Sequence, residues 1–152
     1  MIKILFICHG NICRSPMAEF IMKDKIKKMG REGEFYVESA ATSSEEIWRG
    51  VGNPVYPPAR DVLRAHGIDC AGKRARQIVL EDYDNFDLLI AMDENNIRNM
   101  RRLWKSDPEN KIHLMMEYAG LKRGVADPWY TDDFNTTWDD IELGVTRLLE
   151  SL

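Results

Sequence analysis

Short apolar runs separated by longer amphipathic stretches make up most of the chain. Four of these runs predict β-strands, over residues 3–8, 35–39, 86–92 and 111–115. The 86–92 run is apolar at every position but one, as expected for a strand covered on both faces inside a parallel sheet.

The stretches between the strands carry apolar residues every three or four positions, a spacing that places them on one face of a helix. This pattern predicts a helix over about 16–29, which Gly30 ends, and another that opens at Pro57 and ends at Gly67. Asp93 can cap a third helix. A C-terminal helix has apolar positions at Trp138, Ile141, Val145, Leu148, Leu149 and Leu152.

The alternation of strands and helices predicts an α/β fold: a three-layer, open parallel sheet of four strands with helices on both faces, flavodoxin- or Rossmann-like. A chain of 152 residues is long enough to bury a substantial core, so a single domain over residues 1–152 is expected. Sheets of this kind bind ligands beyond the carboxyl ends of their strands. Residues that directly follow a strand are therefore the first candidates for function.

Composition and charge narrow the function classes. Hydrophobic residues make up 44% of the chain and charged residues 30%, as in ordinary globular proteins. The net charge of −4 provides no basic surface field that would attract nucleic acid. No apolar run approaches the roughly 20 residues that cross a bilayer. The N-terminus does not have the pattern of a signal peptide. Three cysteines, two of them in one loop, do not make a disulfide framework, so we expect a cytoplasmic protein.

The segment after the first strand carries the strongest chemical signal. Cys8 ends the strand, and Arg14 lies six positions later, where a helix is about to begin. The amides of a loop that curls between a strand and a helix point inward and bind an anion, which the helix N-terminus also attracts. Arg14 can grip two phosphate oxygens with its planar fork, and the same field stabilises a nucleophilic thiolate at Cys8. The expected phosphate-binding residues are His9, Gly10, Asn11, Ile12, Cys13, Arg14 and Ser15.

This loop and its flanks, from Phe6 to Glu19, resemble the signature of the low-molecular-weight protein tyrosine phosphatases. The resemblance spans the chain, because residues 39–42, 64–68, 86–93 and 127–130 also fall in the family's order. It implies an enzyme that hydrolyses phosphotyrosine or aryl phosphate monoesters through a phosphocysteine intermediate and needs no cofactor or metal.

A phosphatase of this kind also needs a general acid, because an alkoxide or phenoxide leaves poorly. Asp127 is the candidate, since it lies after the last expected strand, is restricted by Pro128 and is followed by two aromatic residues. The alternative is an ordinary Asp-Pro turn. The predicted catalytic residues are thus Cys8 as nucleophile, Arg14 as phosphate ligand and Asp127 as general acid and base.

The resemblance also implies supporting residues. In the family the hydroxyl that matches Ser15 belongs to a hydrogen-bond network with an asparagine, a serine and a histidine. The matching residues here are Asn11, Ser39 and His66, and capping or core hydrogen bonds are compatible with that role.

Aromatic residues are expected to line the substrate cleft. Trp48, Trp129 and Tyr130 match family positions that flank the cleft, and ring stacking there favours phosphotyrosine over phosphoserine. His9, where the family often has an aliphatic residue, is expected to touch the substrate.

Two features stay open between a functional and a structural role. Cys13, five residues after Cys8, either forms a reversible disulfide with it that prevents irreversible oxidation or is a buried packing thiol. A basic helix face is either simply solvated or docks an acidic partner; it consists of Arg98, Arg101, Arg102 and Lys105.

Three other functions share part of this pattern. An arsenate reductase of similar fold would need a further cysteine pair, and only Cys70 lies outside the loop. A phosphoryl carrier of the cellobiose-type sugar phosphotransferase systems would need neither Arg14 nor an Asp-Pro acid. An inactive phosphotyrosine-binding module would not need Cys8. The expected partner is a phosphotyrosine protein or an aryl phosphate, with no nucleic acid or membrane, and the protein is expected to be a monomer or weak dimer.

Overall fold

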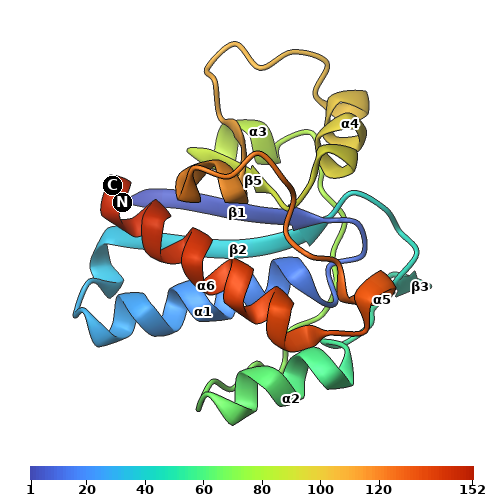
Figure 1. Ribbon diagram of the computed structural model, residues 1–152. Coiled ribbons are helices and arrows are strands. Elements are labelled where there is room, and N and C mark those ends of the chain that lie inside the picture. The colour runs from blue at the N-terminus through green and yellow to red at the C-terminus, as the bar shows by residue number, and fades with distance from the viewer.

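The main sheet has four parallel strands in the order β2-β1-β5-β6 (Figure 1). The computed structural model describes all residues, 1–152. The strands are β1 (Ile2–Cys8), β2 (Phe35–Ala41), β5 (Leu88–Ala91) and β6 (Ile112–Leu114). The α/β class and the four-stranded parallel sheet predicted from the sequence are confirmed.

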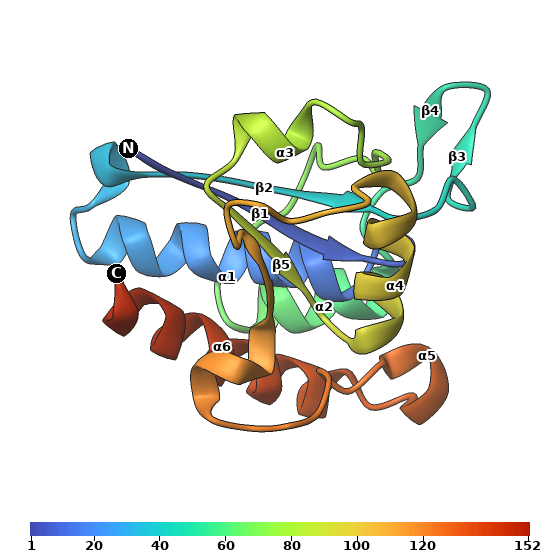
Figure 2. The same ribbon diagram turned by 90° about the horizontal axis from the view of Figure 1, so that it is seen from above.

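Helices cover the sheet on both faces (Figure 2). One face carries α1 (Arg14–Lys28), α2 (Pro57–Ala65) and α6 (Phe134–Ser151), which pack on one another. The other face carries α3 (Asp82–Asn85) and α4 (Glu94–Leu103). Asp93 caps α4 as expected, because its carboxylate accepts a hydrogen bond from the Asn96 amide at 2.8 Å.

Strand β1 is buried from both sides. Ile4 and Phe6 point into the core beneath α1 and α6, whereas Leu5 and Ile7 point into the core beneath α3 and α4. All four side chains are fully buried, and each such burial contributes about 1.5–3 kcal/mol. The carboxyl end of β1, and with it Cys8, is therefore held firmly at the centre of the sheet.

Several short elements were not predicted. Residues 41–56, between the second strand and the helix that opens at Pro57, contain an antiparallel hairpin of β3 (Ile47–Trp48) and β4 (Val51–Gly52), whose two turn residues both have positive φ. One-turn segments also form, namely η1 (Glu32–Glu34), η2 (Met115–Ala119) and α5 (Pro128–Thr131). Strands of two residues are too short to show an alternating pattern.

None of the helices has the length and apolarity needed to span a membrane.

One end of the molecule gathers segments that are far apart in sequence. The carboxyl end of β1, the first turns of α1 and α4, the β3–β4 hairpin and α5 all meet there (Figures 1 and 2). This is the edge at which parallel sheets bind ligands.

Candidate active site

The loop between β1 and α1 curls around the sulfur of Cys8. Asn11 has a φ of 60°, a left-handed conformation that turns its amide back to donate to Cys8 Sγ at 3.3 Å. Cys8 is 4% exposed and lies at the base of a pocket of about 540 Å³. Of the expected phosphate-binding residues, five line this pocket: His9, Gly10, Ile12, Cys13 and Arg14. Asn11 and Ser15 lie buried behind it.

Arg14 is held in the pocket wall by acceptors from two other segments. Its Nη1 donates to Asp93 Oδ2 at 2.8 Å and to the Val125 carbonyl at 3.3 Å, and its Nη2 lies 3.4 Å from Asp127 Oδ2. Burial opposes its charge, but the charges of Cys8, Asp127 and Asp93 raise the pKa of Arg14 overall. The guanidinium is therefore charged and fixed in direction before any ligand binds. Asp93, predicted only as a helix cap, thus also orients Arg14.

The structure brings Asn11, Ser15 and Ser39 together behind the sulfur. Asn11 Nδ2 donates to Ser15 Oγ at 2.8 Å and to Ser39 Oγ at 2.9 Å, while Asn11 Oδ1 accepts the Arg76 amide at 3.1 Å. Because Ser15 Oγ accepts from Asn11, its own proton is free to donate to Cys8 Sγ, 3.0 Å away. The network thus aims a hydroxyl proton at the position where negative charge resides on a thiolate.

The network continues to residues that sequence reasoning missed. Ser39 Oγ donates to Glu19 Oε1 at 2.6 Å, and Glu19 is 3% exposed. Two lysines neutralise this buried carboxylate: Lys73 Nζ lies 3.1 Å from Oε1, and Lys23 Nζ lies 2.6 Å from Oε2. Glu19 follows Ser15 by four residues, so the two share a face of α1. That spacing was the available signal, whereas nothing in the sequence marks Lys73.

His66 does not join this network, contrary to the expectation from the resemblance. It caps the end of α2 on the protein surface, where its Nδ1 lies 3.0 Å from the Val62 carbonyl. Its ring stacks on Trp138 with centroids 3.7 Å apart. The side chain is thereby committed to the contact between α2 and α6.

Asp127 reaches the same pocket from the opposite direction. It caps the one-turn helix α5, with Oδ1 accepting the Trp129 amide at 3.0 Å, and its other oxygen faces Arg14. Trp129 and Tyr130 line the pocket beside it and remain largely exposed, at 66% and 86%. Tyr56 packs edge-on against Trp129, with ring centroids 5.8 Å apart.

Asp140 of α6 fastens the segment that leads to Asp127. Its two carboxylate oxygens each accept from Arg123 at 2.8 Å, and Oδ2 also accepts the Ala126 amide at 3.0 Å. Burial opposes the charge of Asp140, but the Arg123 and Ala126 bonds lower its pKa overall. Thr137 Oγ1 adds a bond to the Ala126 carbonyl at 2.8 Å. These contacts were also missed, because they join residues 11 or more positions apart.

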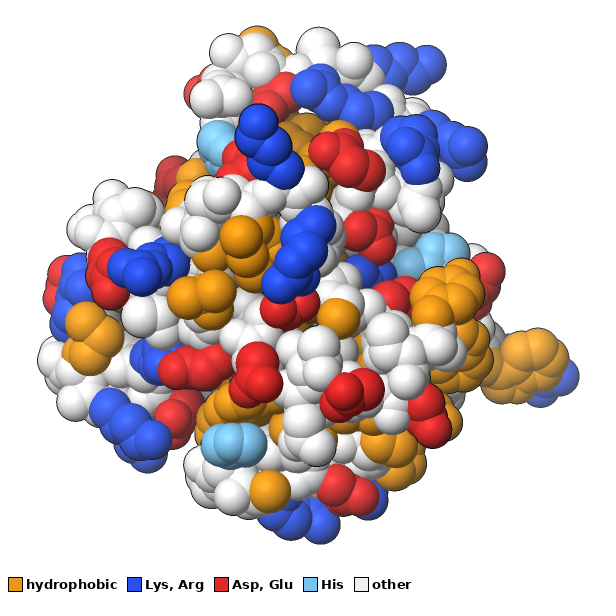
Figure 3. Space-filling model, in the orientation of Figure 1, with side chains coloured by type: hydrophobic (Ala, Val, Ile, Leu, Met, Phe, Trp, Pro, Cys, Tyr) orange, Lys and Arg blue, Asp and Glu red, His pale blue; other side chains and the backbone are white.

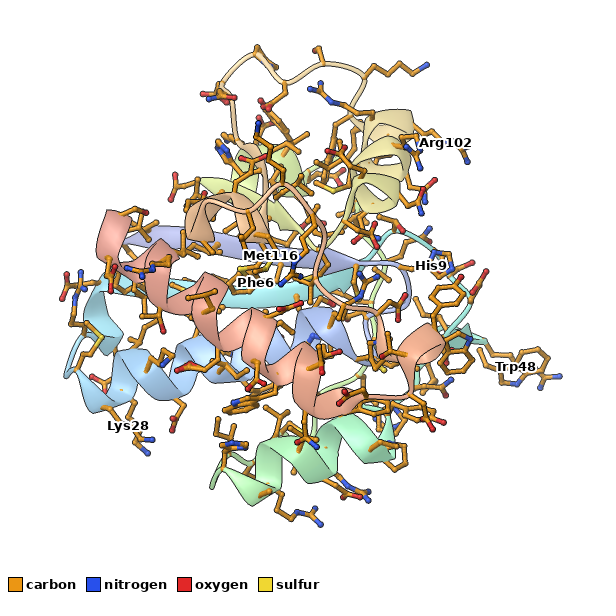
Figure 4. All side chains as sticks on the ribbon, viewed as in Figure 1. Phe6, His9, Lys28, Trp48, Arg102 and Met116 are labelled. Carbon is orange, nitrogen blue, oxygen red and sulfur yellow. The ribbon has the colours of Figure 1, made fainter.

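The rim of the pocket differs from the expectation at Trp48. This side chain does not line the pocket; it is 72% exposed and points away from the body of the molecule (Figure 4). It ends β3 on the outer side of the short hairpin, where Arg49 stacks on its ring. His9 does lie at the rim, with Nε2 2.8 Å from Glu45 Oε2.

Cys13 differs chemically from Cys8, although both line the pocket. Burial, with the nearby Cys8 and Asp127, raises the pKa of Cys13 to about 12. It is therefore a neutral thiol at physiological pH. Nowhere in the chain do three or more His, Cys, Asp or Glu side chains converge closely enough to hold a metal ion.

Comparison with known proteins identifies the family. The sequence profile of the low molecular weight phosphotyrosine protein phosphatases matches residues 3–152. The protein-tyrosine-phosphatase YfkJ of Bacillus subtilis is 38% identical over 154 residues, covering 100% of this chain and 96% of YfkJ. The crystal structure of YfkJ superposes with a TM-score of 0.92 over 99% of this chain and 94% of YfkJ.

Two further solved structures are similar over nearly the whole chain. The low molecular weight protein tyrosine phosphatase of Streptococcus pyogenes has a TM-score of 0.86 and 38% identity, covering 100% of this chain and 93% of its own. A Drosophila arginine phosphatase has a TM-score of 0.86 and 31% identity, covering 99% and 97%. The resemblance seen in the sequence is confirmed, and the chain belongs to the low molecular weight phosphotyrosine protein phosphatase family.

Proposed function

We propose that this protein is a tyrosine phosphatase that hydrolyses phosphotyrosine and other aryl phosphate monoesters through a phosphocysteine intermediate. One observation carries the proposal: a buried cysteine and a fixed guanidinium from one loop and a carboxylate from a distant segment converge on one pocket. They are Cys8, Arg14 and Asp127.

The first step transfers the phosphoryl group to sulfur. The Cys8 thiolate attacks phosphorus in line, the bond from phosphorus to the phenolic oxygen breaks, and Asp127 gives its proton to that oxygen. Arg14 and the inward amides of the loop hold the three equatorial oxygens, where positioning and electrostatic stabilisation supply most of the acceleration. The Ser15 hydroxyl, 3.0 Å from the sulfur, stabilises the thiolate.

The second step releases phosphate. Asp127, now a carboxylate, takes a proton from a water molecule that attacks phosphorus on the side the phenol has left. The sulfur leaves as a thiolate, and the Ser15 and Asn11 donors that stabilised it before the reaction stabilise it again. Neither step draws on a cofactor.

The pocket walls support an aryl substrate. Trp129 and Tyr130 present exposed rings beside Asp127, and Ile12 adds an apolar side chain near the sulfur. Ring stacking of this kind adds about 0.5–1.5 kcal/mol. His9 would touch the substrate from the opposite rim. Because one similar structure is described as an arginine phosphatase, phosphoarginine is the substrate to test against phosphotyrosine.

We further infer that the protein acts on phosphotyrosine proteins in the cytoplasm, as a single domain and as a monomer or weak dimer. Three free cysteines, one of them the nucleophile, suit a reducing compartment. Nucleic acid and membranes are not among the partners that we propose.

For Cys13 we propose a reversible disulfide with Cys8 under peroxide. Peroxide oxidises the Cys8 thiolate to a sulfenic acid, the neutral Cys13 thiol condenses with it, and water leaves. Both thiols line the same pocket and lie five residues apart in one curled loop, which supports this step. Mass spectrometry of peroxide-treated protein should find a Cys8–Cys13 peptide that dithiothreitol removes, and its absence would exclude the disulfide.

The direct test of the proposed function follows hydrolysis of para-nitrophenyl phosphate and phenyl phosphate in the presence of a metal chelator. Cys8→Ser should abolish turnover of both substrates. Asp127→Ala should slow phenyl phosphate far more than para-nitrophenyl phosphate, because nitrophenolate leaves without protonation. No turnover by the fully reduced wild type would exclude the phosphatase assignment, and faster hydrolysis of phosphoarginine than of phosphotyrosine would reassign the substrate.

A further inference from the structure

Helix α4 carries a cluster of cations that have no carboxylate partner. Eleven of the 21 lysine and arginine side chains form ion pairs. Four of the others are exposed along α4 and just beyond its end. We call them the α4 basic face: Arg98, Arg101, Arg102 and Lys105. Figure 3 shows basic side chains gathered over α4, and Figure 4 shows Arg102 among them.

The spacing of these residues works against the helix. Arg98 precedes Arg102 by four residues and Arg101 by three, and Arg101 precedes Lys105 by four. Like charges at these spacings lie side by side and destabilise a helix. Glu94, the one acid in α4, forms no ion pair with any of them. Asp107 and the carboxyl end of the helix attract Arg101, but no ion pair within the protein neutralises any of the four cations.

The same helix forms one wall of the catalytic pocket. Asn95 and Asn99 line the pocket, and Arg98 donates a hydrogen bond to Asn95 Oδ1. Arg102 lies three residues after Asn99 on the adjoining edge of the helix. The α4 basic face therefore begins where the pocket ends.

We propose that the α4 basic face binds acidic residues that flank the phosphotyrosine of a protein substrate. This inference rests on the proposed tyrosine phosphatase function and adds a substrate preference to it. From Asn95 to Arg102 the helix rises by about 10 Å, which about three residues of extended peptide span. The preferred substrates carry Asp or Glu within the few residues next to the phosphotyrosine on one side.

The rest of the rim directs an acidic segment to α4. Glu45 and Glu46 line the pocket from the segment before β3, and the protein has a net charge of −4. An acidic peptide is repelled there and attracted by the unpaired cations of α4. Such rim charges act mainly on the association rate and its salt dependence, and they leave the chemical step unchanged.

The experiment compares matched phosphotyrosine peptides with acidic, neutral and basic flanks on wild type and on Arg98→Glu/Arg102→Glu. We expect wild type to have its highest kcat/KM on the acidic peptide. The charge-reversal variant Arg98→Glu/Arg102→Glu should lower kcat/KM for that peptide about tenfold. High salt should reduce the preference of wild type for the acidic peptide. The control, Lys27→Glu/Arg64→Glu, has the same net charge but changes unpaired exposed cations that do not line the pocket. Both variants should hydrolyse para-nitrophenyl phosphate at the wild-type rate.

The outcomes separate this inference from the proposed function. Equal kcat/KM for the three peptides, or equal losses in the reversal and the control, would overturn the α4 proposal while para-nitrophenyl phosphate turnover still supports a phosphatase. Binding to phosphatidylserine vesicles that the reversal abolishes, with peptide kinetics unmoved, would overturn it in favour of a membrane surface. Absence of turnover on every substrate would refute the proposed function itself.

Discussion

The two segments that meet at the catalytic pocket are built in opposite ways. The nucleophile loop, residues 8–15, is tied into the core: Cys8, Asn11 and Ser15 are buried, and their hydrogen bonds run inward to β2 and α1. The acid loop, residues 121–133, lies on the surface with Trp129 and Tyr130 exposed. A few contacts to α6 and Arg14 fasten it.

This difference matches what each segment has to do. A nucleophile must keep its orientation and its anionic environment throughout, so preorganised donors around it reduce the barrier at no cost during the reaction. An acid that protonates one group and then activates water must accommodate substrate entry and product release, which loosely packed surface segments permit. The nucleophile loop should therefore respond to mutation through rigidity and charge, and the acid loop through leaving-group chemistry.

After loss of the nucleophile itself, the largest effect is expected at Arg14, where the two segments touch. Arg14→Lys keeps the positive charge but loses the planar fork that binds Asp93 and two phosphate oxygens. We expect kcat/KM for para-nitrophenyl phosphate to fall about 10²- to 10³-fold. Steady-state kinetics measure this. The control is Arg60→Lys, at a half-buried residue whose partner is the adjacent Asp61, and it should change nothing.

Asn11 tests whether the nucleophile loop works as a rigid unit. Asn11→Gly retains the left-handed backbone but removes every side-chain bond to Ser15, Ser39 and the Arg76 amide. We expect kcat to fall about ten- to a hundredfold and the free energy of unfolding to fall by about 1–3 kcal/mol. Asn11→Ala should lose about 1 kcal/mol more, because alanine resists a φ of 60°.

Urea unfolding and turnover numbers for the two Asn11 variants separate strain from hydrogen bonding. If Asn11→Gly kept the wild-type kcat, the buried network would not contribute to stabilising the Cys8 thiolate during catalysis. The contrast with the acid loop would then rest on packing alone.

The same contrast explains what the sequence can and cannot predict. The nucleophile loop is specified locally: Cys8, Arg14 and the residues between them follow a strand and open a helix, so the chain itself encodes the cradle. The sheet was predictable for a related reason, since four apolar runs alternate with amphipathic stretches. Boundaries differ from expectation by only a few residues in most elements.

What was not predictable depends on contacts between distant or irregular segments. Lys73 lies in a loop with no periodicity, so nothing reveals that its ammonium reaches Glu19. His66 was expected in the network, but the direction of a side chain at a helix end depends on the neighbouring elements. Here the His66 ring stacks on Trp138 of α6. Trp48 sits on a hairpin too short to predict, and it points outward.

A moderate effect, specific to leaving groups, is expected at Asp140, which anchors the acid loop. Asp140→Asn removes the charge that holds Arg123 and weakens the bond to the Ala126 amide. We expect phenyl phosphate turnover to fall about tenfold while para-nitrophenyl phosphate turnover falls less than about threefold. Equal losses on the two substrates would show that Asp140 does not act through Asp127.

Asp140 should also affect how the free energy of unfolding depends on pH in the acid range. Its folded-state pKa lies below the ordinary value of 3.8, so the stability it contributes is present above that value and is lost as the pH falls through the lower folded value. Asp140→Asn should therefore flatten the pH dependence of the unfolding free energy below about pH 4, measured by urea titration. An unchanged slope in that range would show that Asp140 has no linked stability.

The smallest catalytic effect is expected at Lys73, the far end of the network. Lys73→Met removes one of the two cations at Glu19 and the bond to the Ser39 carbonyl, in a site where the lysine side chain is 12% exposed. Stability should fall by about 1–3 kcal/mol, because a buried carboxylate keeps only Lys23. Turnover should fall only about two- to threefold, since Ser39, Asn11 and Ser15 stand between Glu19 and the sulfur and each keeps its own partners.

Comparing Lys73→Met with Glu19→Gln and the double variant shows whether the network transmits its effect. If the effects of the two substitutions are non-additive in the free energy of unfolding but additive in kcat, Lys73 and Glu19 support the structure and do not affect catalysis directly. A loss of kcat as large as that of Asn11→Gly would contradict this expectation. The hydrogen bonds that link Glu19 to Cys8 would then depend on neutralisation of the Glu19 carboxylate. The rigidity of the nucleophile loop would originate in a lysine that lies outside the loop.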